Sequence, residues 1–323
     1  MGNIDRKQFL QLSASSGAGA VMGKWSTGTK QEQNQSNTRK FRMEFNPTNT
    51  GIEVNQEEAV EMAPRFGFEA VYAYSGYLAE ISDSQRQTLL NRMNELGIVW
   101  GHTGLPIDFR GDKQTFQDGL EKLPGIAESL QKAGVTRMST WIMSSNNELH
   151  YLLNFRQHAT RLREVAGILN DHNIRLALEY VGPKTVWTAN RYPFMHTMAE
   201  TKELIAAIGW PNVGFHLDTA HWHTAGETEE DLLTLSNKDV VSCDLNDVLA
   251  GIKRENLPDT KRELPMATGV VDVGTFLNAL AEIGFDGPIQ AEPFNQELNQ
   301  MENEEAARMT ADAMNRAFAT VDG

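Results

Sequence analysis

The alternation of two kinds of segment constrains this chain more than any other feature of its sequence. Short apolar runs suit β-strands, and longer runs with apolar residues at helical spacing follow them. The expected strands are 41–46, 69–74, 98–102, 135–143, 174–181, 213–217, 240–245 and 288–293. The expected helices are 56–66, 84–96, 113–133, 148–170, 194–208, 228–235, 273–283 and 304–318. Eight such cycles in about 280 residues predict a single α/β domain, a parallel (β/α)8 TIM barrel over residues 41–323.

The alternative for such a chain is an open, doubly wound sheet. That fold binds a nucleotide cofactor at a glycine-rich first turn of the form G-x-G-x-x-G. The segment after the first expected strand reads NPTNTG and lacks this pattern. The sequence therefore favours the closed barrel.

Composition and charge exclude several classes of partner. The chain carries 29 basic and 43 acidic residues, so its net charge is 29 − 43 = −14. This argues against a nucleic-acid partner and against an anionic membrane surface. Cys243 is the single cysteine, which excludes an intramolecular disulfide and a cysteine zinc cluster. No apolar run approaches the roughly 18–20 residues of a membrane span. A homo-oligomer is compatible with all of these features.

Residues 1–40 differ in character from the rest of the chain. Arg6 and Lys7 precede a stretch of apolar and small residues, and a polar run rich in Gln, Asn, Ser and Thr follows. This order resembles a twin-arginine export signal in which Arg6-Lys7 replaces the usual arginine pair. We expect a flexible signal-like segment and linker at 1–40 and a periplasmic location for the barrel. The alternative is a disordered tail without an address, on a cytoplasmic protein.

Acidic residues stand at the C-terminal ends of the last four expected strands. Side chains alternate between the two faces of a strand, and the apolar set in each of these strands suits the helix-facing side. The last inward residues are then Glu179, Asp218, Asp244 and Glu292. Functional residues of a barrel come from these strand ends. Any one of them could be a capping or salt-bridged acid. Four converging carboxylates need a cation to stay ionised, and an all-oxygen site favours Mn²⁺ or Mg²⁺.

The segment 212–223, NVGFHLDTAHWH, concentrates polar and aromatic side chains around one of these acids. Gly214, His216 and Asp218 share one face of the expected strand. His221 follows three residues after Asp218, in what we expect to be a loop. An aspartate at the N-cap of a helix would explain Asp218 equally well.

Five segments of the chain resemble the xylose-isomerase-like TIM-barrel superfamily. They are LALEYVGPKT, HLDTAHW, the DLND run at Asp244, RELPMATGVVD and AEPF. The likeness is to its sugar phosphate isomerase/epimerase family, which includes ketose 3-epimerases and keto-inositol dehydratases. The resemblance implies metal ligands at Glu179, Asp218, position 244 and Glu292. It also implies substrate contacts at His221 and at Arg262, in an Arg-x-x-Pro sequence. Position 244 usually carries His in that family, whereas this chain has Asp.

The expected activity follows from this set of side chains. Moving a proton next to a carbonyl requires a base and an acid placed across the substrate, and a cation can hold the enediolate oxygen. We therefore expect a divalent-metal-dependent isomerase or epimerase acting on a sugar or sugar derivative. Glu179 and Glu292 would transfer the protons, and His221 and Arg262 would orient hydroxyl groups. The alternatives are a keto-inositol or keto-sugar dehydratase on the same metal site and a non-catalytic sugar-binding barrel. A DNA-repair endonuclease barrel fits neither the acidity nor the histidine content.

Other polar and aromatic residues near strand ends are weaker candidates. Trp141 and His102 could contact the sugar, although an aromatic residue can equally fill a barrel interior. Glu44 could hold a substrate hydroxyl. Lys184 could bind a phosphate or carboxylate, although it reads equally as a solvated lysine. His158 and His172 lie on or after a helix, and we expect them to be structural.

Overall fold

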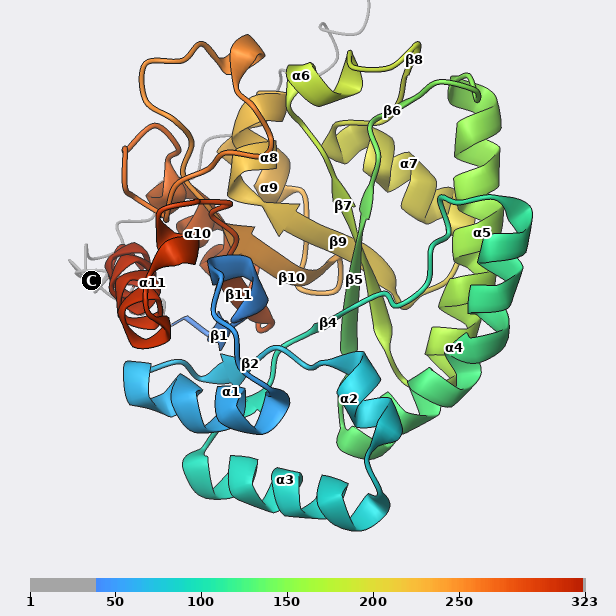
Figure 1. Ribbon diagram of the computed structural model, residues 1–323. Helices are drawn as coiled ribbons and strands as arrows, with labels where there is room; N and C mark the ends of the chain where they lie inside the picture. The colour runs from blue at the N-terminus through green and yellow to red at the C-terminus, as the bar shows by residue number, and fades with distance from the viewer. Residues whose placement is uncertain (1–38, 322–323) are drawn as a thin grey trace, which may run out of the picture. The chain divides into compact units, whose positions relative to one another are not determined.

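The computed structural model describes residues 39–321, in which parallel strands follow one another around a barrel and helices cover its outside (Figure 1). Every barrel pairing between neighbouring strands is parallel. The barrel strands are β1 (Arg42–Phe45), β2 (Ala70–Val71), β3 (Val99–Trp100), β4 (Thr103–Gly104), β5 (Arg137–Ile142), β7 (Arg175–Tyr180), β9 (Val213–Asp218), β10 (Val240–Leu245) and β11 (Pro288–Ala291).

Two short strands together occupy the third position of the barrel and close it. The order of neighbours is β3-β2-β1-β11-β10-β9-β7-β5-β4, so β3 and β4 are the two ends of this series. They are separated in sequence only by Gly101 and His102. Since β3 pairs with β2 and β4 pairs with β5, the ring has eight positions and no free edge. The prediction of a (β/α)8 barrel is confirmed, and the open doubly wound sheet is excluded.

The eight expected helices are all present, with bounds close to the expected ones. Three further short helices were not expected. The helices are α1 (Gln56–Met62), α2 (Ser75–Glu80), α3 (Asp83–Leu96), α4 (Lys113–Ala133), α5 (Tyr151–Asp171), α6 (Lys184–Trp187), α7 (Met198–Ile208), α8 (Thr219–Ala225), α9 (Glu229–Leu233), α10 (Val273–Glu282) and α11 (Asn303–Phe318). The short helices α2, α6 and α8 were not expected, because four to seven residues are too few to show a periodic pattern. Within residues 39–321, one 3-10 turn (Ala63–Phe66) extends α1, and three others lie in the loops with the antiparallel pair β6 (Ser145–Asn146) and β8 (Tyr192–Pro193).

Local signals in the sequence fix where several helices begin and end. Asn55 and Ser82 each form a capping box at the start of α1 and α3, and Asp112 caps α4. Gly97 and Gly134 follow α3 and α4 with φ of 69° and 81°, a left-handed conformation that residues with a β-carbon rarely adopt. These caps explain why the expected and observed bounds of α4 coincide.

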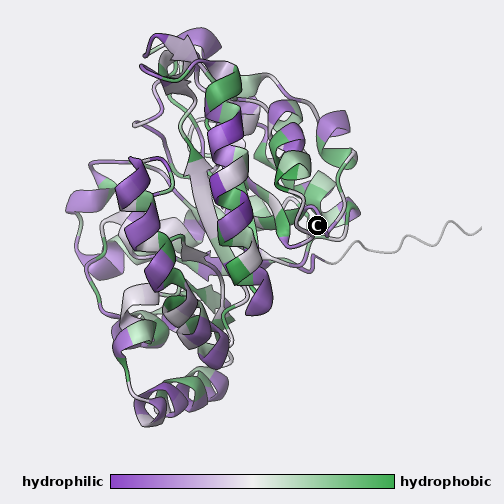
Figure 2. Cartoon of the chain, turned by 90° about the vertical axis from the view of Figure 1, so that its right-hand side faces the viewer, coloured by the Kyte–Doolittle hydropathy of each residue, from purple (hydrophilic) through white to green (hydrophobic). Residues whose placement is uncertain are grey.

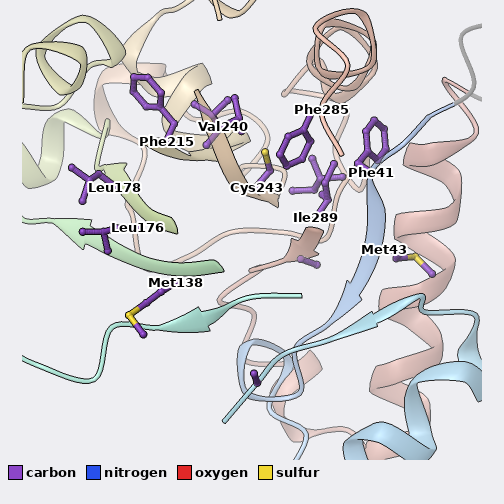
Figure 3. Close-up of a cluster of buried hydrophobic side chains, with 14 of the residues drawn as sticks. Phe41, Met43, Met138, Leu176, Leu178, Phe215, Val240, Cys243, Phe285 and Ile289 are labelled. Atoms are coloured by element: carbon purple, nitrogen blue, oxygen red, sulfur yellow. The ribbon is translucent and has the colours of Figure 1, made fainter. Parts of the chain in front are cut away.

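The hydrophobic core lies mainly between the barrel and its helices. Figure 3 shows a cluster of side chains that leave the strands toward the helices, among them Leu176 and Leu178 of β7, Cys243 of β10 and Ile289 of β11. All four are fully buried. Figure 2 shows hydrophilic and hydrophobic residues interleaved along the outer helices, as expected where one face packs on the barrel. The opposite faces of the same strands are free to carry polar groups.

The signal-like segment predicted at residues 1–40 lies outside the described residues, apart from its last two. Within residues 39–321, no helix combines the length and the apolar character that crossing a membrane requires.

Candidate active site

The four predicted carboxylates meet at the C-terminal end of the barrel. Glu179 lies near the end of β7, Asp218 ends β9, Asp244 lies in β10 and Glu292 directly follows β11. Asp244 pairs in register with Asp218, which places these two acids on adjacent strands. One oxygen atom from each of the four carboxylates lies within 4.8 Å of the others. The expected convergence, and the inward register of all four strands on which it depends, is therefore present.

Asp218 combines the two roles that the sequence left open. It is the N-cap of α8, and its Oδ1 accepts a hydrogen bond from the backbone N–H of His221 at 2.9 Å. Its Oδ2 accepts from Asn246 Nδ2 at 2.5 Å and from Arg262 Nη1 at 2.9 Å. A carboxylate offers about four lone-pair positions, so one remains for a further ligand.

Arg262 lies buried among the acids, with 3% of its surface exposed. Nη1 is 2.9 Å from both Asp218 Oδ2 and Glu292 Oε2, and Nη2 is 2.8 Å from Asp259 Oδ1. Burial alone would lower the pKa of Arg262, but the carboxylates around it, Asp218 first, raise it above its ordinary value. Arg262 is therefore not a solvated surface arginine. Arg262 is a permanent cation of the site.

A second aspartate holds the long loop that carries Arg262. The carboxylate of Asp247, which directly follows Asn246, accepts hydrogen bonds from the backbone N–H groups of Val248, Thr268, Gly269 and Val271 at 2.8–3.1 Å. Its own backbone pairs with Glu263 in an antiparallel bridge. The loop between β10 and α10 is therefore closed on itself, which fixes Arg262 over the barrel. Sequence reasoning included Asp247 in a motif but assigned it no role.

His221 lies in helix α8 and not in the loop that we expected. Its imidazole Nε2 is 3.4 Å from Glu179 Oε1, and Gly182 donates its backbone N–H to Nδ1 at 3.3 Å. A Cβ on Gly182 would lie 2.5 Å from the carbonyl oxygen of His221, so only glycine allows this approach. His221 therefore sits beside Glu179 as well as next to Asp218.

His216 is the site residue that sequence reasoning placed on the right face but left without a function. Its Nε2 lies 3.1 Å from Asp244 Oδ1, and its Nδ1 lies 2.7 Å from Ser242 Oγ. Burial lowers the pKa of His216, but Asp244 more than compensates and raises it to about 10. In return, although burial would raise the pKa of Asp244, His216 lowers it. The alternation of side chains in β9 was the signal that could have found this pair.

His102 is held by Glu44 at the break between β3 and β4. Glu44 Oε1 accepts from the backbone N–H of His102 at 3.0 Å, and Oε2 lies 2.8 Å from Nδ1. Gly101 leaves space for this carboxylate, because a Cβ there would lie 2.1 Å from Glu44 Cδ. Both oxygens of Glu44 are thus engaged with His102, so Glu44 positions the imidazole rather than a substrate hydroxyl.

Glu292 and Asp218 both have a pKa above the ordinary value of their side chain. Burial, and then the charge of Asp244, raises the pKa of Glu292 well above its ordinary value, against the opposing effect of Arg262. Burial likewise raises the pKa of Asp218, although Arg262 opposes this. Glu292 is 20% exposed, so it is the one of these two that a ligand can reach.

Two cavities adjoin the carboxylates. One has a volume of about 220 Å³ and is lined mainly by polar side chains, including His102, His216 and Asp244. The other, of about 390 Å³, includes His221 and Arg262 together with several apolar side chains. Among the described residues, Trp141, Glu179 and Glu292 line both cavities. The two glutamates proposed for proton transfer therefore lie where the cavities meet.

Comparison with known proteins identifies the family. The family model of the xylose isomerase-like TIM barrel matches residues 60–317. The chain belongs to this family. A solved member, a xylose isomerase domain protein from Alicyclobacillus acidocaldarius subsp. acidocaldarius, is similar with a TM-score of 0.77 and 30% identity, over 88% of this chain and 100% of that one.

Curated relatives of this xylose isomerase-like barrel include named sugar enzymes. An inosose isomerase from Bacillus subtilis (strain 168) is 27% identical over 49% of this chain and 55% of its own length. A ketose 3-epimerase from Arthrobacter globiformis is 29% identical over 42% of this chain and 40% of its own length. The chain thus spans about half the length of these relatives. A structure of the IOLI protein with a bound zinc atom shares the fold, with a TM-score of 0.71 and 20% identity over 86% of this chain and 98% of that one.

The donor set of this family member fits a divalent cation. In the part of the chain that the structure describes, Glu179 Oε1 and Asp244 Oδ1 are buried without a hydrogen bond, although His221 and His216 lie 3.4 Å and 3.1 Å from them. Ligands on opposite sides of Mg²⁺ are about 4.2 Å apart, close to the 4.8 Å that spans the four oxygens. The residues that would hold the ion are Glu179, Asp218, Asp244 and Glu292. Deprotonated His216 could also join Glu179 and Asp244 as a nitrogen donor.

Of the weaker candidates from the sequence, Trp141 lies at the site, whereas Lys184, His158 and His172 do not line either cavity. Trp141 lies beside Glu179 in register on β5, is 40% exposed and has Arg110 over its ring at 4.2 Å. Lys184 is exposed at the start of α6 and lines neither cavity, as the solvated alternative predicts. His158 and His172 belong to α5 and its C-cap, away from the acids.

Proposed function

We propose that the protein is a divalent-metal-dependent isomerase or epimerase that moves a proton on the carbon next to the carbonyl of a sugar or sugar derivative. The observation that carries the proposal is the convergence of four carboxylates from β7, β9, β10 and β11 at the mouth of the barrel. The activities named for the inosose isomerase and ketose 3-epimerase relatives support it. Mn²⁺ or Mg²⁺ suits a site of four carboxylate oxygens.

Glu179 and Glu292 are the groups that would exchange protons with the substrate. They come from β7 and β11, which are separated in the ring by β9 and β10. One glutamate removes the proton as a general base, and the other returns a proton from its own side. Burial and the charge of Asp244 raise the pKa of Glu292, whereas a bound cation would act in the opposite direction. A bound divalent ion would supply Lewis-acid stabilisation of the enediolate charge.

The other polar residues hold and orient the substrate. Arg262 keeps Glu292 and Asp218 in place and limits the repulsion between them. His102, fixed through Nδ1 by Glu44, turns its remaining nitrogen to a hydroxyl group in the polar cavity. Asn46 and Gln290, joined by a 3.0 Å hydrogen bond, line the same cavity and offer further amide groups. These are the donors and acceptors that sugar hydroxyls require.

Hydrogen–deuterium exchange tests the proposal without knowledge of the product. We expect the protein with Mn²⁺ in D₂O to exchange one carbon-bound hydrogen of at least one sugar in a panel of keto-sugars and keto-inositols, as read by mass spectrometry and NMR. Removal of the ion with a chelator should stop the exchange, and its return should restore it. Stoichiometric binding of Mn²⁺ or Mg²⁺ with no exchange on any member of the panel would favour a non-catalytic sugar-binding barrel.

The His102–Glu44 pair keeps a second activity open, that of a keto-sugar dehydratase. A histidine held by a carboxylate can protonate a departing hydroxyl, which converts the same enediolate into a product that has lost water. Product analysis in the exchange experiment separates the two activities. Exchange with an unchanged mass formula indicates an isomerase or epimerase, and loss of water indicates the lyase.

A further inference from the structure

The two cavities that meet at Glu179 and Glu292 differ sharply in the side chains that line them. The smaller one presents His102, Tyr72, Arg110 and other polar groups. The larger one presents Trp141, Met143, Val181, Val186 and Phe294 opposite its polar residues. Binding a fully hydroxylated sugar against this apolar lining would be unfavourable, because its hydroxyl groups would lose hydrogen bonds to water there.

Four of the five apolar residues come from the ends of two neighbouring strands and the segments that follow them. Trp141 and Met143 come from the end of β5 and the loop that follows, and Val181 and Val186 come from the loop after β7 and from α6. Since Ile142 pairs with Tyr180 in register, Met143 and Val181 directly follow neighbouring positions of the two strands. At about 390 Å³, the cavity lies in the range of about 300–1,000 Å³ found for small-molecule sites.

This apolar lining is fixed by hydrogen bonds from both sides. Ser145 Oγ donates to the carbonyl of Val186 at 2.8 Å, which ties α6 to the loop after β5. Thr185 Oγ1 donates to the carbonyl of Leu257 at 2.8 Å, which ties α6 to the loop after β10. The cavity therefore exists before a ligand arrives, and binding into it requires little ordering of the chain.

Phe294 completes the cavity from the opposite side in a strained conformation. Its φ of 41° is in the left-handed region that residues with a β-carbon rarely adopt. Its ring remains 39% exposed and lies 4.7 Å from the Arg262 guanidinium carbon. Strained backbone conformations concentrate at functional sites. Trp141, 40% exposed, lines the cavity as well, with the Arg110 guanidinium 4.2 Å from its ring centroid.

We propose that the substrate has two parts, a sugar or cyclitol ring that carries a keto group in the polar cavity and an apolar substituent, most simply an aromatic aglycone, in the apolar cavity. The placement of the reacting sugar carbon between Glu179 and Glu292 rests on the proposed function, whereas the preference for an apolar substituent rests on the second cavity alone. Aromatic side chains such as Trp141 and Phe294 can stack on an aromatic ring while its sugar part stays at the acids.

Matched pairs of glycosides test this preference. The probes are the methyl and the phenyl β-glycosides of glucose, galactose and xylose, titrated against the full chain with Mn²⁺ by calorimetry and by Trp fluorescence. We expect at least one phenyl glycoside to bind at least about tenfold more tightly than the methyl glycoside of the same sugar. Equal affinities for both members of every pair, or no binding by any phenyl glycoside, would overturn the proposal.

Variants of the apolar lining locate the preference. Val186→Thr keeps the shape of the side chain but adds a hydroxyl, and Phe294→Asn removes the ring while tolerating the left-handed backbone. Each should weaken binding of the phenyl glycoside more than binding of the methyl glycoside, and the double variant should bring the two affinities together. Leu152→Ser, at a 59% exposed position on α5 outside both cavities, is the matched control. A phenyl preference that survives in the double variant would place the aromatic group elsewhere and contradict the proposal.

Proton exchange on keto-sugars, measured separately, distinguishes the proposed isomerase activity from the proposed two-part substrate. Exchange without any phenyl preference would leave the proposed function standing and reject the two-part substrate. A phenyl preference without exchange on any keto-sugar would support the apolar subsite and reject the isomerase.

Discussion

Single residues at the mouth of this barrel carry more than one interaction each. Asp218 caps α8, accepts from Asn246 and contacts Arg262. Asn246 also accepts the backbone N–H of Glu292 at 2.9 Å, so one amide fixes acids from β9 and β11 relative to each other. Losing such a residue would leave buried polar groups unpaired as well as remove a chemical function.

The two glutamates at the meeting point of the cavities give the sharpest test at this scale. We predict that Glu179→Gln and Glu292→Gln each lower kcat by at least about 10²-fold, the usual scale for a general acid or base. Gln retains an oxygen donor and the size of the side chain but cannot accept the proton. Stopped assays measure kcat, and Mn²⁺ binding is measured in parallel to separate loss of the ion from loss of proton transfer.

Glu282→Gln, at an exposed position at the end of α10, serves as the control and should keep the wild-type rate. A variant with one glutamate intact should still exchange the substrate hydrogen from that side without completing the reaction. Wild-type turnover in either Gln variant would contradict the two-glutamate mechanism and direct attention to His221 or His102 as the base.

At the scale of elements, the loops that follow the strands position side chains of the site. Two of these loops contain ordered structure that no periodic sequence pattern predicts. Helix α8 spans seven residues and brings His221 back over Asp218. The loop between β10 and α10 is held by the carboxylate of Asp247 and delivers Arg262. Each depends on one carboxylate that bonds to backbone N–H groups, Asp218 three residues away and Asp247 mainly 21–24 residues away, and residue periodicity reveals neither.

Helix α5 contains a buried histidine whose protonation should oppose folding. His158 donates from Nδ1 to the carbonyl of Asn154 at 2.9 Å, and its Nε2 has no partner among the described residues. Burial lowers its pKa to about 4. Below the ordinary pKa of about 6.5 the unfolded chain binds a proton that the folded chain does not, so stability falls as the pH drops from about 6.5 toward about 4.

The expected size of this effect can be measured by substitution. Between pH 7 and pH 5, His158 should contribute about 2 kcal/mol to the loss of free energy of unfolding. His158→Phe removes the titrating group and retains an aromatic ring between Phe109 and Phe194. Urea unfolding at the two pH values should show a smaller loss in the variant by about that amount. An identical pH dependence in both proteins would show that the folded chain accommodates the proton.

At the scale of the whole molecule, closure of the barrel brings distant parts of the sequence into one site. Glu44 and Glu292 are almost at opposite ends of the described chain, yet β1 pairs with β11. The third position is shared by β3 and β4, and the break between them turns His102 toward Glu44. A site built from so many strands depends on the complete ring, since each strand supplies one or two side chains.

The location of the protein is a prediction that concerns the chain as a whole. Residues 1–40, with Arg6-Lys7 ahead of a small-residue stretch, should direct a folded reporter to the periplasm of a bacterium with a twin-arginine export system. The measurement is fractionation of a fluorescent reporter fused to these residues, with an Arg6→Gln/Lys7→Gln fusion as the control. A reporter that remains wholly cytoplasmic in the unaltered fusion would favour the alternative of a tail without an address.

The sequence by itself determined the barrel and the four acids. Strand and helix periods differ, so eight cycles were visible directly, and alternation within β7, β9, β10 and β11 assigned Glu179, Asp218, Asp244 and Glu292 to the inner face. Turn and cap residues such as Gly134 marked where helices end. These are local properties, in which each residue is read against neighbours a few positions away.

Only the tertiary structure decided how those acids are partnered and what surrounds them. The sequence does not predict that Arg262 contacts Asp218 and Glu292. It also does not predict that His216 pairs with Asp244 or that Glu44 holds His102. The apolar cavity beside the acids is likewise formed by residues from β5, β7, α6 and α8 and from the segments that follow β10 and β11. Such contacts depend on the closure of the ring and on the paths of its loops, because burial and packing are set by neighbours in space and not by neighbours in the chain.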